Sequence, residues 1–201
     1  MQSLFDWIPD LKHVKTASLH KPPPNIDYEW LNVEELAATQ ATHAIGDEYD
    51  VNLLIDTVKR SLTLLRNQSI MIFAESKRSV DKISDALRKA EIKNLPYYQD
   101  IGVQGRQMTL QHFFRRELPV LVCTNIASRG LDTMNVDHVI QFDFAKNPVD
   151  YLHRVGRTGR LGQPGLVTNF IRRTDYDLET KIRDCDLRGE SYDNIIQKKK
   201  P

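Results

Sequence analysis

Short apolar runs alternate along the chain with segments whose apolar residues recur at helical spacing. Residues 69–74 and 120–123 are almost continuously apolar, which is typical of strands buried on both faces of a sheet. Residues 49–65 instead carry apolar side chains three and four positions apart, as on one face of a helix. The pattern predicts strands at 26–33, 69–74, 95–98, 120–123, 136–142 and 166–171, and helices at 49–65, 80–90, 108–114, 176–187 and from Pro148 onward.

Strands and helices that alternate in this way predict an α/β fold, with a parallel sheet between two layers of helices. Residues 26–190 would form this domain. Residues 1–25, which include three consecutive prolines, are predicted to be a lead-in or linker, and residues 191–201 a basic tail. Residues 34–48 are predicted to be a loop or a short irregular helix, and Asp50 to cap the helix that follows.

Polar clusters follow three of the predicted strands, at residues 75–77, at 124–132 and from Asp143 onward. The carboxyl ends of parallel strands share one edge of a sheet, and ligands of such sheets bind beyond that edge. We therefore expect the three clusters to converge there.

Composition limits the classes of function. Of the 201 residues, 40% are apolar and 27% charged, which is enough apolar content for a packed core. The net charge is +1, so the chain has no overall positive field for nucleic acid, and any anion site has to be local. Cys123 and Cys185 give neither a disulfide framework nor a zinc pattern, and they predict a reducing compartment. No apolar run is long enough to cross a membrane.

The strongest local concentration of positive charge is at residues 153–160, which read HRVGRTGR. Arginine presents a planar fork of donors that matches two phosphate oxygens at once, and the two glycines keep bulk away from the backbone between the arginines. The segment therefore predicts a clamp for a polyphosphate. A solvated turn with incidental basic residues is the alternative interpretation.

A second candidate site is the segment at residues 124–132, which reads TNIASRGLD and directly follows an apolar strand. The Thr124 hydroxyl could donate to a phosphate oxygen, and Asp132, an acceptor when ionised, suits a ribose hydroxyl. A helix cap at Thr124 and an ordinary surface ion pair at Arg129 fit the same residues equally well.

The two segments, in this order, resemble motifs V and VI of the DEAD-box RNA helicases of superfamily 2, and residues 70–76 (IMIFAES) resemble motif IV. The similarity covers about residues 19–190. It implies the second of the two RecA-like domains of such an enzyme, a three-layer fold of the P-loop NTPase type. The octet HRVGRTGR fits the family pattern at every position, whereas motif V carries Asn125 in place of the usual aspartate.

The resemblance implies roles for the residues that match. Arg157 and Arg160 correspond to the two catalytic arginines that reach the γ-phosphate of ATP. Asp132 corresponds to the residue that contacts the ATP ribose. His153 and Arg154 correspond to nucleotide-site positions that join the ATP site to the contact between the domains.

The resemblance also implies contacts with the RNA backbone, spread over motifs IV and V and the segment between them. These contacts would be made by Ser76, Asp100, Arg106, Thr124 and Gly130. The segment between the motifs departs from the family pattern, because Tyr98 and Gln99 replace the usual histidine and glycine, and Val103 replaces a usual glutamine. We expect Thr124, Asp132, Arg157 and Arg160 to lie on one edge of the sheet.

The sequence contains no phosphate loop of the form GxxxxGK[ST], so ATP and Mg²⁺ would be held mainly by another domain. Residues 47–50 (DEYD) look superficially like the family's acidic box, but they do not follow an apolar strand and are predicted to start a helix.

The first functional hypothesis is the C-terminal half of an ATP-dependent RNA helicase that remodels RNA or RNA–protein complexes and is inactive as this chain alone. Its partners would be RNA, the N-terminal RecA-like domain of the same protein and ribonucleoprotein or ribosomal assembly factors. The alternative is a standalone RNA- or ribonucleoprotein-binding module without ATPase activity. The expected location is the nucleus, nucleolus or cytoplasm, or a mitochondrion or other organelle, with no attachment to a membrane.

Overall fold

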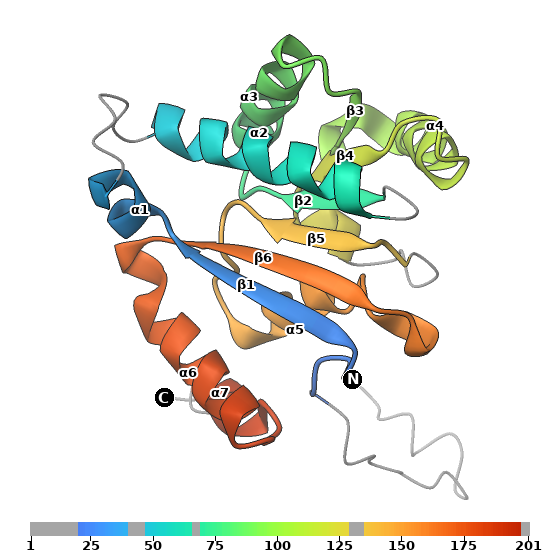
Figure 1. Cartoon of the computed structure of the whole chain (residues 1–201). Helices are drawn as coiled ribbons and strands as arrows, with labels where there is room; N and C mark the ends of the chain where they lie inside the picture. The colour runs from blue at the N-terminus through green and yellow to red at the C-terminus, as the bar shows by residue number, and fades with distance from the viewer. Residues whose placement is uncertain (1–19, 40–46, 66–68, 129–134, 198–201) are drawn as a thin grey trace, which may run out of the picture.

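The computed structural model describes residues 20–39, 47–65, 69–128 and 135–197, and these contain one six-stranded parallel sheet (Figure 1). The order of the strands across the sheet is β1-β6-β5-β2-β4-β3, and every neighbouring pair is parallel. The strands are β1 (Ile26–Asn32), β2 (Ile70–Phe73), β3 (Asn94–Tyr97), β4 (Val120–Cys123), β5 (His138–Gln141) and β6 (Gly165–Ile171).

Helices cover both faces of the sheet, so the three-layer α/β prediction is confirmed (Figure 1). Alternate residues of each strand enter two separate cores, as the two-residue repeat of a strand requires: Met71 and Phe73 lie in one, Ile70 and Ile72 in the other. The second core is covered by α1 (Val33–Thr39), α2 (Asp47–Leu64) and α3 (Lys77–Lys89). The first is covered by α4 (Gly102–Phe114), α5 (Pro148–Val155), α6 (Tyr176–Leu187) and α7 (Asp193–Gln197).

The predicted strands match the observed ones to within a few residues, but the start of one helix and the role of one residue were predicted wrongly. Helix α4 begins at Gly102, earlier than predicted. The prediction missed this first turn because it contains two glycines and lacks an apolar pattern. Asp50 does not cap α2, since the helix begins three residues before it. Its carboxylate is largely buried and instead accepts hydrogen bonds from Arg172 Nε (3.1 Å) and Nη2 (2.7 Å).

The folded domain extends beyond residue 190, where the basic tail was predicted to start. Tyr192 is fully buried, and its hydroxyl donates to Asp186 at 2.6 Å. The end of the predicted lead-in joins the same region, because the backbone carbonyl of His20 accepts from the backbone amide of Tyr192 at 3.1 Å. The rest of the lead-in, residues 1–19, and the last residues, 198–201, lie outside the described residues.

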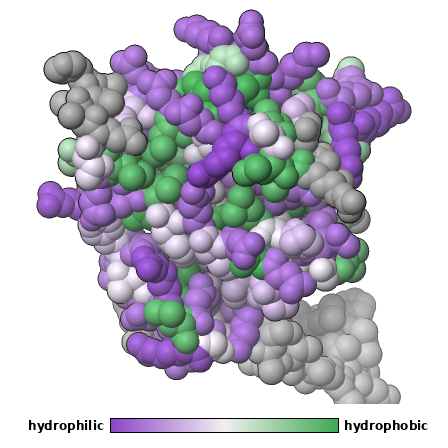
Figure 2. Space-filling view, viewed as in Figure 1, coloured by the Kyte–Doolittle hydropathy of each residue, from purple (hydrophilic) through white to green (hydrophobic). Residues whose placement is uncertain are grey.

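The surface in the view of Figure 1 is mixed in character, with hydrophilic side chains interspersed among apolar ones (Figure 2). Across residues 20–39, 47–65, 69–128 and 135–197, no helix is both long and apolar enough to cross a lipid bilayer.

A chain of polar side chains, buried except for the partly exposed Glu29, connects α2 to three strands. The Ser61 hydroxyl lies 2.7 Å from His138 Nδ1, and His138 Nε2 lies 2.8 Å from the Thr168 hydroxyl, which donates to Glu29 at 2.8 Å. The Thr168 hydroxyl donates its hydrogen bond to Glu29, so the Thr168 oxygen accepts from the Nε2–H of His138. The imidazole is then neutral, and its unprotonated Nδ1 accepts from the Ser61 hydroxyl. His138, which is fully buried, is therefore a structural histidine.

Acidification is expected to destabilise the domain through His138. Burial and, second, the charge of Arg60 lower the pKa of His138 from 6.5 to about 3. Below pH 6.5 the imidazole of His138 becomes protonated in the unfolded chain, whereas in the folded chain it stays neutral down to about pH 3. The free energy of unfolding should therefore fall by about 1.4 kcal/mol per pH unit between pH 6 and 3 from this residue. Urea titrations at several pH values would measure the slope, and a slope in His138→Gln as steep as in the wild type would contradict the assignment.

Candidate nucleotide and RNA interface

The three polar clusters predicted from the strand ends do converge at the carboxyl edge of the sheet. The backbone amide of Glu75, after β2, donates to Asp143 Oδ2, after β5, at 2.7 Å. Asn125, after β4, accepts from Arg154 Nε at 2.8 Å, and Arg154 also reaches the carbonyl of Asp143. The described parts of all three clusters thus belong to one connected region.

Arg154 is the centre of this region and is 2% exposed. Its guanidinium donates to Asn125 Oδ1 (2.8 Å), Gln141 Oε1 (3.1 Å) and the Asp143 carbonyl (2.6 Å), and it lies 5.1 Å from the centre of the Phe73 ring. Burial lowers the pKa of the Arg154 guanidinium. The resemblance placed Arg154 among the nucleotide contacts, but in this structure it links motifs V and VI inside the domain.

Replacement of Arg154 by alanine should destabilise the domain strongly. The change removes this donor from the buried Gln141 Oε1 and the half-buried Asn125 Oδ1 and empties a buried site, so we expect a loss of about 3–5 kcal/mol in the free energy of unfolding. Chemical denaturation would measure it, with Arg88→Ala as the control, since Arg88 is exposed on α3. A loss below about 1 kcal/mol, similar to that of an ordinary surface substitution, would contradict the role.

Four of the five predicted RNA-contacting residues lie at the carboxyl ends of β2, β3 and β4. Ser76 caps α3 by accepting from the Ser79 amide at 3.1 Å, and its neighbour Lys77 pairs with Asp100 at 3.1 Å. The hydrogen bond to Asp100 raises the pKa of Lys77.

The other two of these residues are fixed through the backbone near β3. Arg106 donates to the Gln99 carbonyl at 2.6 Å, and the Thr124 amide donates to the Tyr97 carbonyl at 3.2 Å. The predicted RNA-contacting side chains are therefore close together. Gly130, the fifth predicted RNA contact, and Asp132, the predicted ribose contact, lie outside the described residues.

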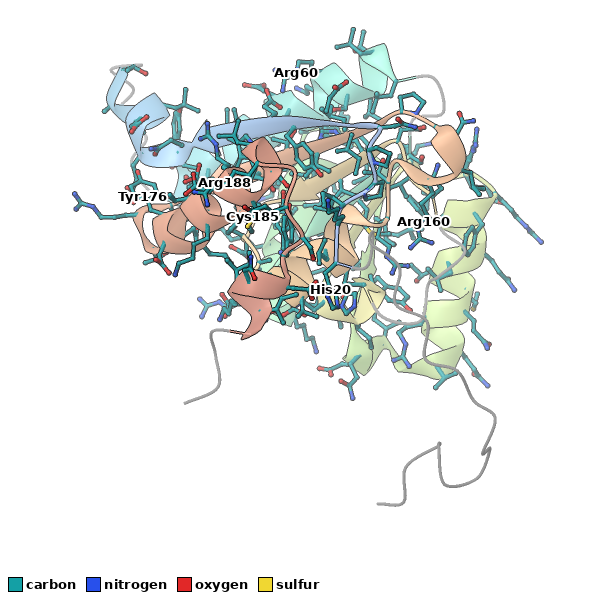
Figure 3. All side chains as sticks on the ribbon, turned by 90° about the horizontal axis from the view of Figure 1, so that it is seen from below. His20, Arg60, Arg160, Tyr176, Cys185 and Arg188 are labelled. Atoms are coloured by element: carbon teal, nitrogen blue, oxygen red, sulfur yellow. The ribbon has the colours of Figure 1, made fainter. Side chains whose placement is uncertain are left out.

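The expectation that Arg157 and Arg160 share the carboxyl edge with Thr124 is wrong. Helix α5 begins after the carboxyl end of β5 and runs back along the strand, so the residues that follow it reach the amino edge. The backbone carbonyl of Arg157 accepts from Val136, which precedes β5, at 2.9 Å. Figure 3 shows Arg160 on the opposite side of the molecule from Tyr176, which follows the carboxyl end of β6.

The two arginines also differ in exposure. Arg157 is 4% exposed, and it donates to the carbonyls of His153 and Ser128, each at 3.0 Å. Arg160 is partly exposed; its Nε donates to the Gly156 carbonyl and its backbone amide to Asn135 Oδ1 at 3.2 Å. His153, the other predicted nucleotide contact in this segment, has an exposed side chain on α5.

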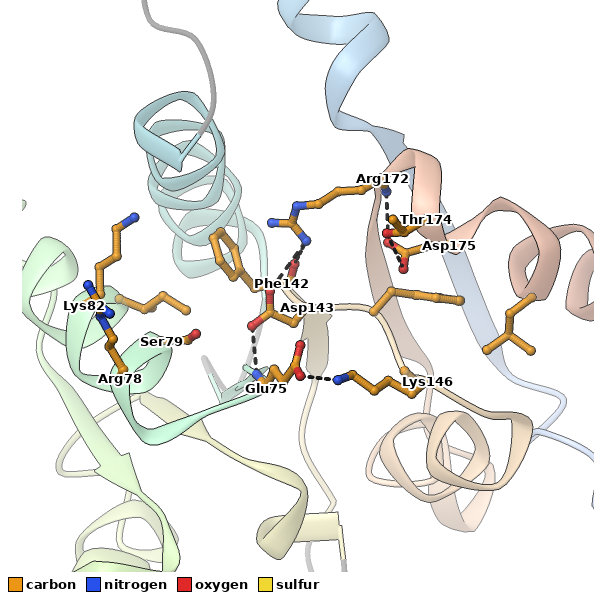
Figure 4. A pocket seen from close by; sticks show the side chains of 14 residues that line it. Glu75, Arg78, Ser79, Lys82, Phe142, Asp143, Lys146, Arg172, Thr174 and Asp175 are labelled. Carbon is orange, nitrogen blue, oxygen red and sulfur yellow. Dashed lines mark hydrogen bonds and ion pairs between the residues drawn. The ribbon is translucent and has the colours of Figure 1, made fainter.

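A charged hollow of about 770 Å³, which sequence reasoning missed, lies beyond the carboxyl ends of β2, β5 and β6 (Figure 4). Arg172 pairs there with Asp50 and with Asp143, and Glu75 pairs with Lys146. Pairing of these charges with one another favours a structural role for the network. The signal in the sequence was a charged residue directly after a buried strand, as at Arg172.

Within the described ranges, no three His, Cys, Asp or Glu side chains lie close enough together to hold a metal ion. Groups that can donate hydrogen bonds to an anion lie at two places. One is the carboxyl edge, with the predicted RNA-contacting residues, called the RNA candidates below, and the other is the loop of Arg160 at the amino edge.

Comparison with known sequences identifies the family. The profile of the helicase conserved C-terminal domain matches residues 52–162, more than half of the chain. DEAD-box ATP-dependent RNA helicase 39 of Arabidopsis thaliana is 32% identical over 187 residues, which are 92% of this chain and 28% of that protein. DEAD-box ATP-dependent RNA helicase 22 of Oryza sativa subsp. japonica is 34% identical over 198 residues, 96% of this chain and 32% of that protein. The chain spans about a third of the length of these relatives.

Solved structures show the same fold. S. cerevisiae Dbp5 bound to RNA and ADP BeF3 superposes with a TM-score of 0.73 at 19% identity, covering 90% of this chain and 44% of that one. The separate C-terminal domain of Dbp5 gives a TM-score of 0.66 at 21% identity, covering 80% and 84%. With a parallel RecA-like sheet, motifs IV to VI in family order and a matching family profile, the chain belongs to the DEAD-box RNA helicases as a helicase C-terminal domain.

Proposed function

We propose that this domain is the C-terminal half of an ATP-dependent RNA helicase that remodels RNA or RNA–protein complexes. In this proposal, Arg160 and Arg157 act on the γ-phosphate from the amino edge, while the carboxyl edge holds part of the RNA backbone. ATP and Mg²⁺ are held mainly by the N-terminal RecA-like domain of the same protein, and Asp132 contacts the ribose. The observation that carries the proposal is the grouping of Ser76, Asp100, Arg106 and Thr124 around three adjacent strand ends.

The two arginines would contribute differently. Arg160 is partly exposed and is the better placed to meet a nucleotide as the protein stands. Arg157 has to leave the carbonyl of Ser128 before its fork can meet a phosphate, so its engagement requires movement at the end of motif V. A closed arrangement of two domains around ATP and RNA supplies a reason for that movement, because phosphate oxygens are stronger acceptors for arginine than a carbonyl.

RNA binding by this chain alone is expected to be weak, salt-dependent and tolerant of sequence, because the basic groups are few and local. Fluorescence anisotropy with a labelled ten-nucleotide oligouridylate, titrated at 50 and 200 mM salt, tests this. Arg106→Ala should weaken binding and reduce the salt dependence, and Arg88→Ala, on the exposed face of α3, serves as the control. Tight binding of one RNA sequence that is insensitive to salt would instead favour the standalone binding module.

A further inference from the structure

Leu161 combines two unfavourable features, exposure and a left-handed backbone. Its side chain is 97% exposed, and its φ and ψ are 54° and 34°. A residue with a β-carbon pays free energy for this conformation. Two of the other described residues with positive φ and a side chain, Glu91 and Arg116, directly follow the caps of α3 and α4, where a left-handed residue is ordinary. Leu161 instead lies within a tight turn beside Arg160.

The loop that carries Leu161 is held firmly from its inner side. Gly159 packs so closely that a β-carbon there would lie 2.6 Å from Ile26 Cγ1. The amide of Arg160 donates to Asn135, and the amide of Gln163 donates back to the Arg160 carbonyl at 3.0 Å. The leucine is therefore presented to solvent by a fixed turn. Because the backbone of the turn is already ordered, burial of the leucine by a partner costs only the ordering of its side chain.

We propose that Leu161 is an apolar anchor that the ATP-binding half of the enzyme buries when the two halves close. The inference rests on the proposed function. Consecutive Cα atoms are about 3.8 Å apart, so a surface that brings a γ-phosphate to Arg160 comes within reach of the exposed Leu161 side chain. RNA does not fit as the occupant, because the RNA candidates lie at the opposite edge of the sheet and an aliphatic side chain offers nothing to a phosphate. The occupant is thus an apolar depression on the companion half, next to its nucleotide.

Burial of one leucine side chain corresponds to a shift of about ten- to a hundredfold in the closing equilibrium. The free energy lost to exposure of the leucine in the open form would be recovered only in the closed form. Loss of the anchor should therefore lower kcat/KM for RNA-stimulated ATP turnover by about tenfold or more, without weakening the fold of this domain.

The test uses the protein that carries both halves, with Leu161→Asn as the main variant, because asparagine tolerates the left-handed conformation. Leu161→Met keeps an apolar side chain and should stay within about threefold of the wild type. Leu187→Asn, at an 84% exposed leucine of α6, is the matched control and should be unchanged. Thermal unfolding of the 201-residue domain should show Leu161→Asn at least as stable as the wild type.

The outcomes separate the two proposals. A wild-type protein without RNA-stimulated turnover overturns the proposed function itself. An active wild type with Leu161→Asn within twofold of it overturns the anchor, as does an equal loss in Leu187→Asn or in Leu161→Met. If Leu161→Asn loses both turnover and thermal stability, Leu161→Gly decides, since glycine is relaxed at this φ. Full activity in that variant overturns the anchor, and a tenfold loss with an intact fold supports it.

Discussion

Replacement of Arg160 by alanine in the complete helicase is expected to lower RNA-stimulated ATP turnover by roughly 10³-fold or more, with little change in RNA affinity. Negative charge on the transferring phosphoryl group has to be stabilised most strongly in the transition state, so an arginine aimed at it lowers the barrier more than it strengthens binding. Arg160 lies on the opposite edge of the sheet from the RNA candidates, which is why the two readouts should separate.

The measurement is a steady-state phosphate-release assay beside an RNA-binding titration of the same preparation. Arg160→Lys keeps the charge without the planar fork and should recover only part of the rate. Arg157→Ala gives a less clear result, because Arg157 is buried against Ser128 and its loss also disturbs the fold. A parallel loss of turnover and RNA affinity in Arg160→Ala would contradict the assignment.

The 201-residue chain by itself is expected to hydrolyse no ATP. Phosphoryl transfer requires a cradle of backbone amides, a lysine on the β- and γ-phosphates, a carboxylate for magnesium and a positioned water. The sequence contains no phosphate loop to supply the cradle. The arginines contribute little without a nucleotide fixed opposite them, since their effect depends on orientation.

Phosphate release by the purified chain with ATP, Mg²⁺ and RNA tests this expectation directly. Adding a separately prepared N-terminal RecA-like domain should restore some RNA-stimulated turnover, limited by association of the two parts. Turnover that copurifies with the chain alone and disappears in Arg160→Ala would reveal a nucleotide site within these residues and contradict the prediction.

The sheet could be predicted from the sequence largely because two of its central strands, residues 70–73 and 120–123, are buried on both faces and apolar at every position. The convergence of the strand ends followed from the parallel topology alone. The position of Arg157 and Arg160 followed from the same topology but was overlooked: both residues lie between a helix and the next parallel strand, where the chain has to return to the amino edge.

The burial of Arg154 was also missed, although the sequence carried a signal for it. Arg154 follows Tyr151 by three positions and precedes Val155, and both of these are fully buried, so all three share the inner face of α5. A motif read as a string of letters assigns chemistry to each arginine but does not say which face of a helix each one occupies. The partners of Arg154 come from β4, β5 and their loops, which only the folded chain brings together.

The pairing of the first strand with the last has a consequence for biosynthesis. Ile26 of β1 pairs with Gly165 of β6, so β1 has no neighbour in the sheet until nearly the whole domain has left the ribosome. A pairing of such long range makes folding slow and leaves a nascent strand available for aggregation. Asp27 and Glu29 interrupt the aromatic side chains of β1, and charges in such a strand discourage pairing with foreign chains. Asp27 and Glu29 are thus expected to limit aggregation of the nascent chain between the synthesis of β1 and the synthesis of its partner strand β6.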